Sequence, residues 1–264
     1  MHRGMRAAAQ RKMVVAMKPE KLDLPRLLDA GDGGLVVELG SDIHEGVNRA
    51  VIGLGDALSA LGIPGIRELV PTYRSLLILF DPLELPRETL RTQVMALWPP
   101  RSGKARRHRS WRVPVLYGGE HGVDLESVAA MHGLSPEEVV ALHSGAEYRI
   151  YMIGFAPGFA YLGGLPERIH TSRRADPRMK TPPRSISIGG RQSAVSPPLE
   201  IPSGWHLLGQ TPVRSYDRRR TDKPFLFEAG DTIRFEPVSV ADYEEMCAIV
   251  EAGGEVALRE DADG

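Results

Sequence analysis

The sequence predicts an α+β unit of the ferredoxin-like type followed by a mainly-β unit built as a small closed barrel. The first observation is the order strand, helix, strand, strand, helix over residues 35–97, which is typical of a split βαβ unit. The second is the content of 28 glycines and 21 prolines in 264 residues, which disfavours a helix bundle and favours turn-rich β structure. The third is a basic stretch near residue 105 that separates the two patterns.

Composition excludes several classes of protein. The 33 Lys and Arg residues nearly balance 34 Asp and Glu residues, so a dedicated nucleic-acid binder is not expected. The single cysteine, Cys247, excludes an intrachain disulfide and a Cys-rich zinc site. No apolar run reaches the roughly 20 residues of a membrane span, so we expect no membrane partner and a cytoplasmic location.

Residues 1–20 are predicted to be a disordered tail. They carry five basic residues and no acidic residue before Glu20, and the apolar run 13–17 is too short for a secretory signal. Met5, Met13 and Met17 could each begin the chain, so the true start codon stays open.

The first unit spans residues 21–100. Its elements are a strand at 35–39, a helix from Ser41 to Gly62, strands at 66–70 and 73–80, and a helix opened by Pro86. Residues 111–116 are one candidate for a last strand of this sheet, and they also begin the second unit. Three polar residues lie near the ends of these elements: Asp32, His44 and Asp81. We expect them to cap helices or to stabilise turns rather than to take part in catalysis.

Residues 101–110 are predicted to be a basic linker. An anion or nucleic-acid patch is the alternative, but no aromatic side chains interleave with the arginines of this run. A solvated hinge between two units is therefore favoured.

The second unit spans residues 111–250. Two short helices are expected at 124–131 and 135–143, the second with a capping box that begins at Ser135. Nine prolines and eight glycines between 154 and 212 exclude a long helix there and predict short strands joined by rigid loops. Strands at 225–227 and 232–235 and a helix capped by Ser239 end the unit, and residues 251–264 are expected to fray.

Common catalytic signatures are absent from the sequence. There is no phosphate-binding P-loop, no serine-hydrolase elbow and no histidine spacing typical of a metal site. A self-contained metal enzyme or triad hydrolase is therefore not expected.

One segment carries the candidate chemistry. The run from Gly154 to Pro166 reads GFAPGFAYLGGLP, in which glycines allow a ligand to approach the backbone and aromatic rings can line a pocket. Five basic residues follow, and they suit either an oxyanion or a solvated face that docks a partner: Arg173, Arg174, Arg178, Lys180 and Arg184. His143 lies at the end of the helix just before this segment. It is either a C-terminal helix cap or an acid/base group.

The motif residues resemble a known family. Together with Gly204-Trp-His-Leu-Leu-Gly-Gln-Thr-Pro212, the Gly154–Pro166 string resembles the family of 5-oxoprolinase B subunits, which also covers Kip-type kinase inhibitors and allophanate hydrolase subunit 1. The resemblance implies the C and D subdomains of a carboxyltransferase domain, with a ferredoxin-like unit and a cyclophilin-like barrel. It also implies ATP-dependent conversion of 5-oxoproline to glutamate in a hetero-oligomer with subunits A and C. We expect the single chain to be inactive, because its sequence shows no nucleotide motif and no complete catalytic constellation.

The resemblance transfers the family motif onto one catalytic candidate, His143, and onto ten residues for binding of substrate or anion. Those ten are Phe155, Pro157, Gly158, Phe159, Tyr161, Arg173, Arg174, Gln192, Gly204 and Trp205. No metal is expected, and ATP is expected only at the level of the complex.

The chain departs from the family between Gln192 and Trp205. Ser196 stands where the family has a tyrosine, and Ala194 and Ser203 stand where it has glycines. We expect a pocket that differs from the family's, either in its substrate or as that of a paralogue with altered function.

Two alternative functions remain open on the sequence alone. One is a binding module that inhibits a sensor histidine kinase. The other is a carboxyltransferase component of a urea or allophanate-type carboxylase or hydrolase, with biotin expected only for the carboxylase.

Overall fold

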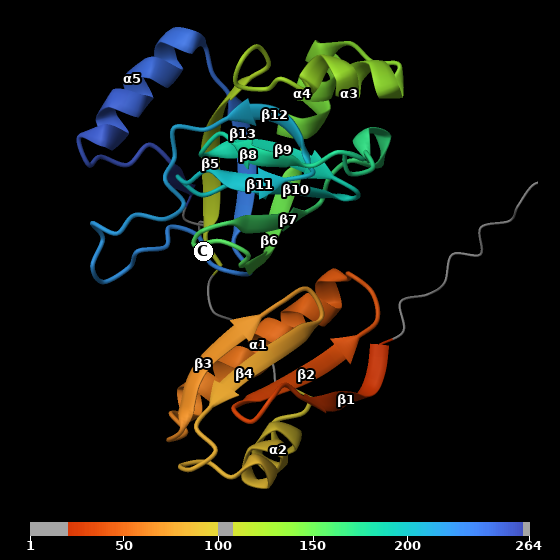
Figure 1. Ribbon diagram of the computed structural model, residues 1–264, viewed down its shortest axis with the longest axis vertical. Helices are drawn as coiled ribbons and strands as arrows, with labels where there is room; N and C mark the ends of the chain where they lie inside the picture. Colours follow the sequence, from red (N-terminus) through yellow and green to blue (C-terminus); the bar gives the residue numbers. More distant parts are fainter. Residues whose placement is uncertain (1–20, 100–107, 261–264) are drawn as a thin grey trace, which may run out of the picture.

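The computed structural model describes residues 21–99 and 108–260. An α+β unit and a β-barrel unit lie one after the other along the long axis of the molecule (Figure 1). The predicted fold class is therefore confirmed. The predicted tail 1–20, most of the predicted linker 101–110, and residues 261–264 lie outside the described residues.

The first unit is a four-stranded antiparallel sheet with two helices. The sheet order is β1-β2-β4-β3. The elements are β1 (Lys21–Asp29), β2 (Gly34–Gly40), α1 (Glu45–Leu61), β3 (Ile66–Pro71), β4 (Ser75–Phe80) and α2 (Arg87–Ala96). Strand β4 lies between β2 and β3, which α1 connects, so the predicted split βαβ unit is confirmed.

The candidate for a last strand of this sheet, 111–116, lies in the second unit instead, where the predicted unit boundary at residue 111 places it. The edge beside β2 is filled by β1, and residues 111–116 belong instead to barrel strand β5 (Ser110–Tyr117). The arrangement is that of a ferredoxin-like sheet whose edge strand comes from the N-terminal side of the chain.

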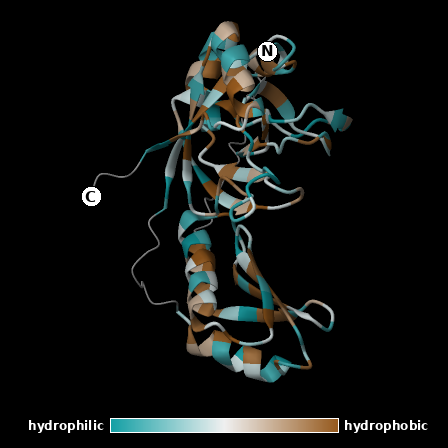
Figure 2. Cartoon of the chain, turned by 90° about the vertical axis from the view of Figure 1, so that its left-hand side faces the viewer, coloured by the Kyte–Doolittle hydropathy of each residue, from teal (hydrophilic) through white to brown (hydrophobic). Residues whose placement is uncertain are grey.

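Alternating burial explains why both helices lie on one face of this sheet. Leu35, Val37 and Leu39 of β2 are buried in the same cluster as residues of β4, α1 and α2. His44 caps α1, because its Nδ1 accepts the N–H of Gly46 at 3.1 Å. Figure 2 shows hydrophobic residues on the helices and strands of both units.

The second unit is a closed barrel of seven strands within the described residues. The order β12-β9-β10-β7-β6-β13-β5 closes through pairing of β12 with β5. Besides β5, the strands are β6 (Glu147–Ile153), β7 (Ala160–Gly163), β9 (Ser185–Gly189), β10 (Gln192–Val195), β12 (His206–Gln210) and β13 (Thr232–Pro237). Strands β5 and β13 are parallel and the other neighbours are antiparallel.

Smaller elements surround the barrel. They are α3 (Leu125–His132), α4 (Pro136–Ser144), the 3₁₀ turn η1 (Glu167–Ile169), the paired arm strands β8 (Arg178–Thr181) and β11 (Ile201–Ser203), and α5 (Val240–Glu251). The capping box at Ser135 and the cap at Ser239 are both confirmed. The expected strand at 225–227 is wrong, because only an isolated bridge joins Phe225 to Tyr216.

The chain beyond α5 is ordered further than the sequence predicts. Strand β14 (Leu258–Glu260) pairs antiparallel with β5, and Ala257 is buried in the barrel core. The expected fraying from residue 251 is therefore wrong for residues up to 260. In the described ranges, no helix combines the length and the apolar character that crossing a membrane requires.

Candidate functional site

The Gly154–Pro166 segment brings aromatic rings together on one side of the barrel. Phe159 and Tyr161 lie 4.6 Å apart between ring centroids, and Trp205 lies 6.0 Å from Tyr161. Trp205 approaches the chain so closely at Gly189 that a Cβ there would lie 2.7 Å from the indole. The structure therefore joins three predicted site residues into what we call the aromatic cluster: Phe159, Tyr161 and Trp205.

The start of the same segment has an unusual backbone. Phe155 has a φ of 69° and is 65% exposed, and its ring contacts Phe159 edge-on at 5.7 Å. Gly158 has a φ of +83°, and a Cβ there would lie 2.7 Å from Cβ of Tyr216. Only glycine satisfies both conditions at position 158. Pro157 is exposed.

Arg173 lies against the aromatic cluster. Its guanidinium lies 5.7 Å from the ring centroid of Trp205, in a cation–π arrangement. Its charge also favours the ionised form of Tyr161, although burial is the larger effect and raises the pKa of that phenol. Among the described residues, no carboxylate forms an ion pair with Arg173.

Arg174 has a different environment. Its Nη1 lies 3.2 Å from Asp124 Oδ1, and Arg178 donates two hydrogen bonds to the same carboxylate, at 2.8 and 2.7 Å. Burial alone would raise the pKa of Asp124, but hydrogen bonds from Arg178 and the Leu207 N–H outweigh it and lower that pKa. Arg174 therefore has a partner when no ligand is bound, as a partly desolvated guanidinium requires.

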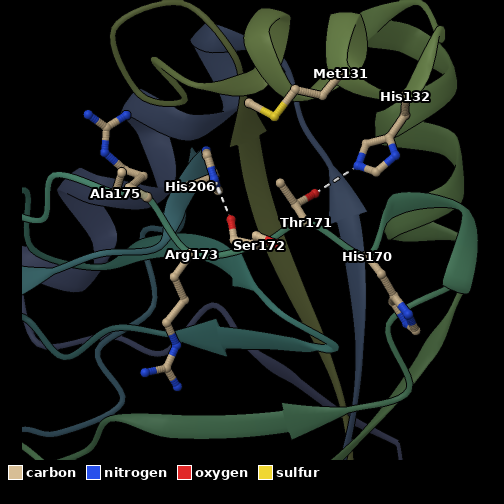
Figure 3. A pocket seen from close by; sticks show the side chains of 9 residues that line it. Met131, His132, His170, Thr171, Ser172, Arg173, Ala175 and His206 are labelled. Carbon is tan, nitrogen blue, oxygen red and sulfur yellow. Dashed lines mark hydrogen bonds between the residues drawn. The ribbon is translucent and has the colours of Figure 1, made fainter.

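Both arginines line one cavity of about 360 Å³. Its other walls include His132, His170 and His206 (Figure 3). In Figure 3 the Arg173 side chain extends away from His206 and Thr171. The cavity is thus basic, as an anion site requires.

The histidines of this cavity have their Nε2 atoms engaged. His132 Nε2 lies 2.9 Å from Thr171 Oγ1, and His206 Nε2 lies 2.9 Å from the Ser172 carbonyl. His206 Nδ1 is buried and has no hydrogen-bond partner within the described part of the chain. No group of three or more metal-ligating side chains gathers here or elsewhere in residues 21–99 and 108–260.

His143 does not join this cavity. Its side chain is 0% exposed, and its ring stacks on Phe235 at 4.8 Å. Burial lowers the pKa of the imidazole to about 3. From the sequence we also expect His143, Phe155, Pro157 and at least one of the two arginines to line a common cavity. That expectation is wrong, because the end of α4 directs the His143 ring into the barrel core, and neither Phe155 nor Pro157 lines the cavity of the arginines.

Two further predicted residues lie near the aromatic cluster. Gln192 is half-buried in β10, directly opposite Gly189. The carbonyl of Gly204 accepts the N–H of Arg174 at 2.7 Å and so fixes the arginine segment beside Trp205.

The residues that depart from the family pattern fit without strain. Ala194 is fully buried against Phe159 and Trp205, and Ser203 Oγ accepts the Trp205 N–H at 3.1 Å. Neither has a positive φ, so neither position needs glycine here. Ser196 is buried and adds no ring to the cluster.

The first unit adds a residue that sequence reasoning missed. Tyr73 lies with its ring centroid 5.4 Å from Tyr151 and 6.0 Å from Tyr161. The aromatic cluster therefore continues across the boundary between the two units. The family resemblance includes Tyr73, within the pattern Pro71-x-Tyr73-x-Ser75-Leu, but it assigned this residue no role in the site. The contact joins residues about 80 positions apart, and the sequence did not predict it.

Comparison with protein families decides what kind of chain carries this site. Residues 25–227 match the family described as carboxyltransferase domain, subdomain C and D. The chain belongs to this family. This carboxyltransferase C/D chain is 37% identical in sequence to the 5-oxoprolinase B subunit of Bacillus subtilis (strain 168). The match covers 81% of this chain and 92% of that protein. It is 38% identical to the 5-oxoprolinase B subunit of Escherichia coli O157:H7, over 78% and 93%.

Solved structures agree on the fold of this carboxyltransferase C/D chain. The crystal structure of TTHA0988 has a TM-score of 0.70 and 34% identity, and covers 78% of this chain. This chain spans only 40% of the length of that structure. The Kluyveromyces lactis urea carboxylase has a TM-score of 0.73 at 17% identity, over 89% of this chain and 24% of that chain, and shows likeness of fold alone.

Proposed function

We propose that this chain is the B subunit of an ATP-dependent 5-oxoprolinase that converts 5-oxoproline to glutamate together with subunits A and C. The names of relatives at 37% and 38% identity support this proposal, since they match the chain over nearly their whole length. ATP acts at the level of the complex, in a cytoplasmic hetero-oligomer.

The observation that carries the proposal is the guanidinium of Arg173 at Trp205, which has no carboxylate partner among the described residues. A guanidinium fork binds a carboxylate with two parallel hydrogen bonds, and 5-oxoproline carries one carboxylate. Within the aromatic cluster Phe159 and Trp205 are buried, and the half-buried ring of Tyr161 offers apolar surface for the small ring of this substrate. The paired Arg174 holds the segment in place through Asp124.

The chain's own residues bind and orient in this proposal. His143 is fully buried and neutral, so it moves no proton to a substrate. The groups that open the ring therefore come from the partner subunits. Neither the kinase-inhibitor function nor the biotin-linked carboxylase function is favoured by the comparisons with relatives.

An omission experiment tests the proposal. Glutamate formation from 5-oxoproline and ATP is measured for the three co-expressed subunits, for each pair of subunits, and for this chain alone. We expect turnover only with all three subunits. Robust turnover by this chain alone, or equal turnover by subunits A and C without it, would contradict the proposal.

A further inference from the structure

We propose that the ligand site of this chain spans both units. In this arrangement Tyr73 of the first unit donates its phenol hydroxyl to the small carboxylate that Arg173 binds, and Asn48 positions Tyr73. The inference rests on the proposed function for the carboxylate's identity, and its geometry rests on four observations that follow.

A tight turn presents Tyr73 at the tip of the β3–β4 hairpin. Thr72 Oγ1 accepts the N–H of Ser75 at 3.2 Å, and the Thr72 N–H donates to the Ser75 carbonyl at 2.8 Å. These bonds close the hairpin around residues 73 and 74. The Tyr73 ring contacts Tyr151 and Tyr161 of the second unit, as described above.

The Tyr73 hydroxyl has an unmet hydrogen-bonding capacity. The oxygen is buried and has no partner within the described residues. A buried hydroxyl without a partner is unfavourable, so a ligand oxygen that accepts its proton is stabilised. Burial raises the pKa of this phenol, which therefore stays a donor, while the charge of Arg173 acts in the opposite direction.

The two unpaired groups define the class of ligand. Arg173 supplies one positive charge without a carboxylate partner among the described residues, and Tyr73 supplies one neutral donor. A planar monoanion with two oxygens matches this set, since one oxygen accepts from the guanidinium and the other from the phenol. The half-buried ring of Tyr161 suits a small apolar body attached to that carboxylate.

Asn48 on α1 connects both sides of this site. Its side chain is 0% exposed, and its Nδ2 donates to the Thr72 carbonyl at 3.0 Å and to the Tyr151 carbonyl at 2.9 Å. Its Oδ1 accepts from Arg149 Nε at 3.4 Å. One amide thus fixes the turn that carries Tyr73 and the barrel strand that faces it, which makes Asn48 a positioning residue.

The test is isothermal titration of the full chain with four small carboxylates: 5-oxoproline, proline, succinate and acetate. We expect at least one to bind the wild-type chain, with affinity falling about tenfold in Tyr73→Phe, which loses one hydrogen bond to a charged group. Tyr243→Phe is the matched control. It removes a phenol on α5 that packs on His121, and it should bind as the wild type does.

Asn48→Ala should lower the affinity of the otherwise wild-type chain for the carboxylate. In a chain that already carries Tyr73→Phe, the same substitution should lower the affinity by less than a further twofold. A purely structural defect would instead add in full to the effect of Tyr73→Phe.

Binding of another of the four carboxylates but not of 5-oxoproline, with the same dependence on Tyr73, would contradict the proposed function and support this inference. Equal affinity of Tyr73→Phe and wild type for a bound carboxylate would overturn the inference and leave the proposed function standing. Failure of all four carboxylates to bind the wild-type chain would also overturn it.

Discussion

The imidazole of His143 lies between two hydroxyl groups. Its Nδ1 is 2.8 Å from the Tyr117 hydroxyl, and its Nε2 is 2.9 Å from Ser193 Oγ. Both ring nitrogens are therefore engaged, and the neutral ring is the form that the core accommodates. Such a group contributes to stability rather than to proton transfer.

This environment predicts how acid affects stability. His143 has a pKa of about 3 in the folded chain and an ordinary pKa of about 6.5 when unfolded. At a pH between these two pKa values, His143 is protonated in the unfolded chain and neutral in the folded chain. The free energy of unfolding therefore falls as the pH falls through this range. From pH 7 to pH 5 the loss from this group is about 2 kcal/mol.

Urea unfolding at pH 7 and pH 5 checks the prediction. His143→Gln should be less stable at pH 7, yet its loss of stability between the two pH values should be smaller than the wild type's by about that amount. An unchanged loss in the variant would show that His143 is not the group responsible.

Individual residues of the site differ in how well the sequence predicted them. The family motif marks Phe159, Tyr161 and Trp205, and their rings come together in the structure. Tyr161 lies in β7 and Trp205 directly precedes β12, two strands that β9 and β10 separate in the sheet. His143 is close to the motif along the chain, but the direction of a side chain at a helix end depends on packing. Tyr73 and Asn48 were missed as site residues because their role depends on contact between two units.

At the scale of the elements, the turn Gly154–Gly158 requires glycine at its last position. Gly158→Ala should lower the free energy of unfolding by about 2 kcal/mol, because alanine is strained at positive φ and its Cβ collides with Tyr216. Chemical denaturation of the purified chain measures this loss.

Gly253→Ala provides the control for that experiment. Gly253 has a φ of +97°, and nothing lies within 4 Å of the position that a Cβ would take there, so alanine has the backbone strain without the collision. The loss at position 158 should exceed the loss at position 253. Equal losses would mean that close packing against Tyr216 does not constrain the turn.

Two strands show why element assignment failed at the edges of the sheets. Strand β1 contains Pro25, a residue typical of edges and bulges, and its pairing with β2 is irregular between Lys21 and Arg26. Strand β14 has only three residues, and its Leu258 is 61% exposed. Neither segment has an alternating apolar pattern long enough to predict a strand.

At the scale of the whole molecule, the sequence predicted both units but not how they meet. A strand pattern at 111–116 indicates a strand, yet it does not say which sheet the strand joins. The structure places that strand in the barrel, parallel to β13. The contact between the units depends on Asn48, Tyr73 and Tyr151, which are far apart in sequence.

The central claim is that Arg173 binds the carboxylate of the substrate, and steady-state kinetics of the assembled three-subunit complex tests it most directly. Arg173→Ala should raise KM for 5-oxoproline about tenfold or more with little change in kcat, because it removes a charge-assisted pair made on binding. Arg168→Ala, at an exposed arginine of η1, should leave both constants unchanged. A KM for Arg173→Ala within twofold of the wild type would contradict the claim.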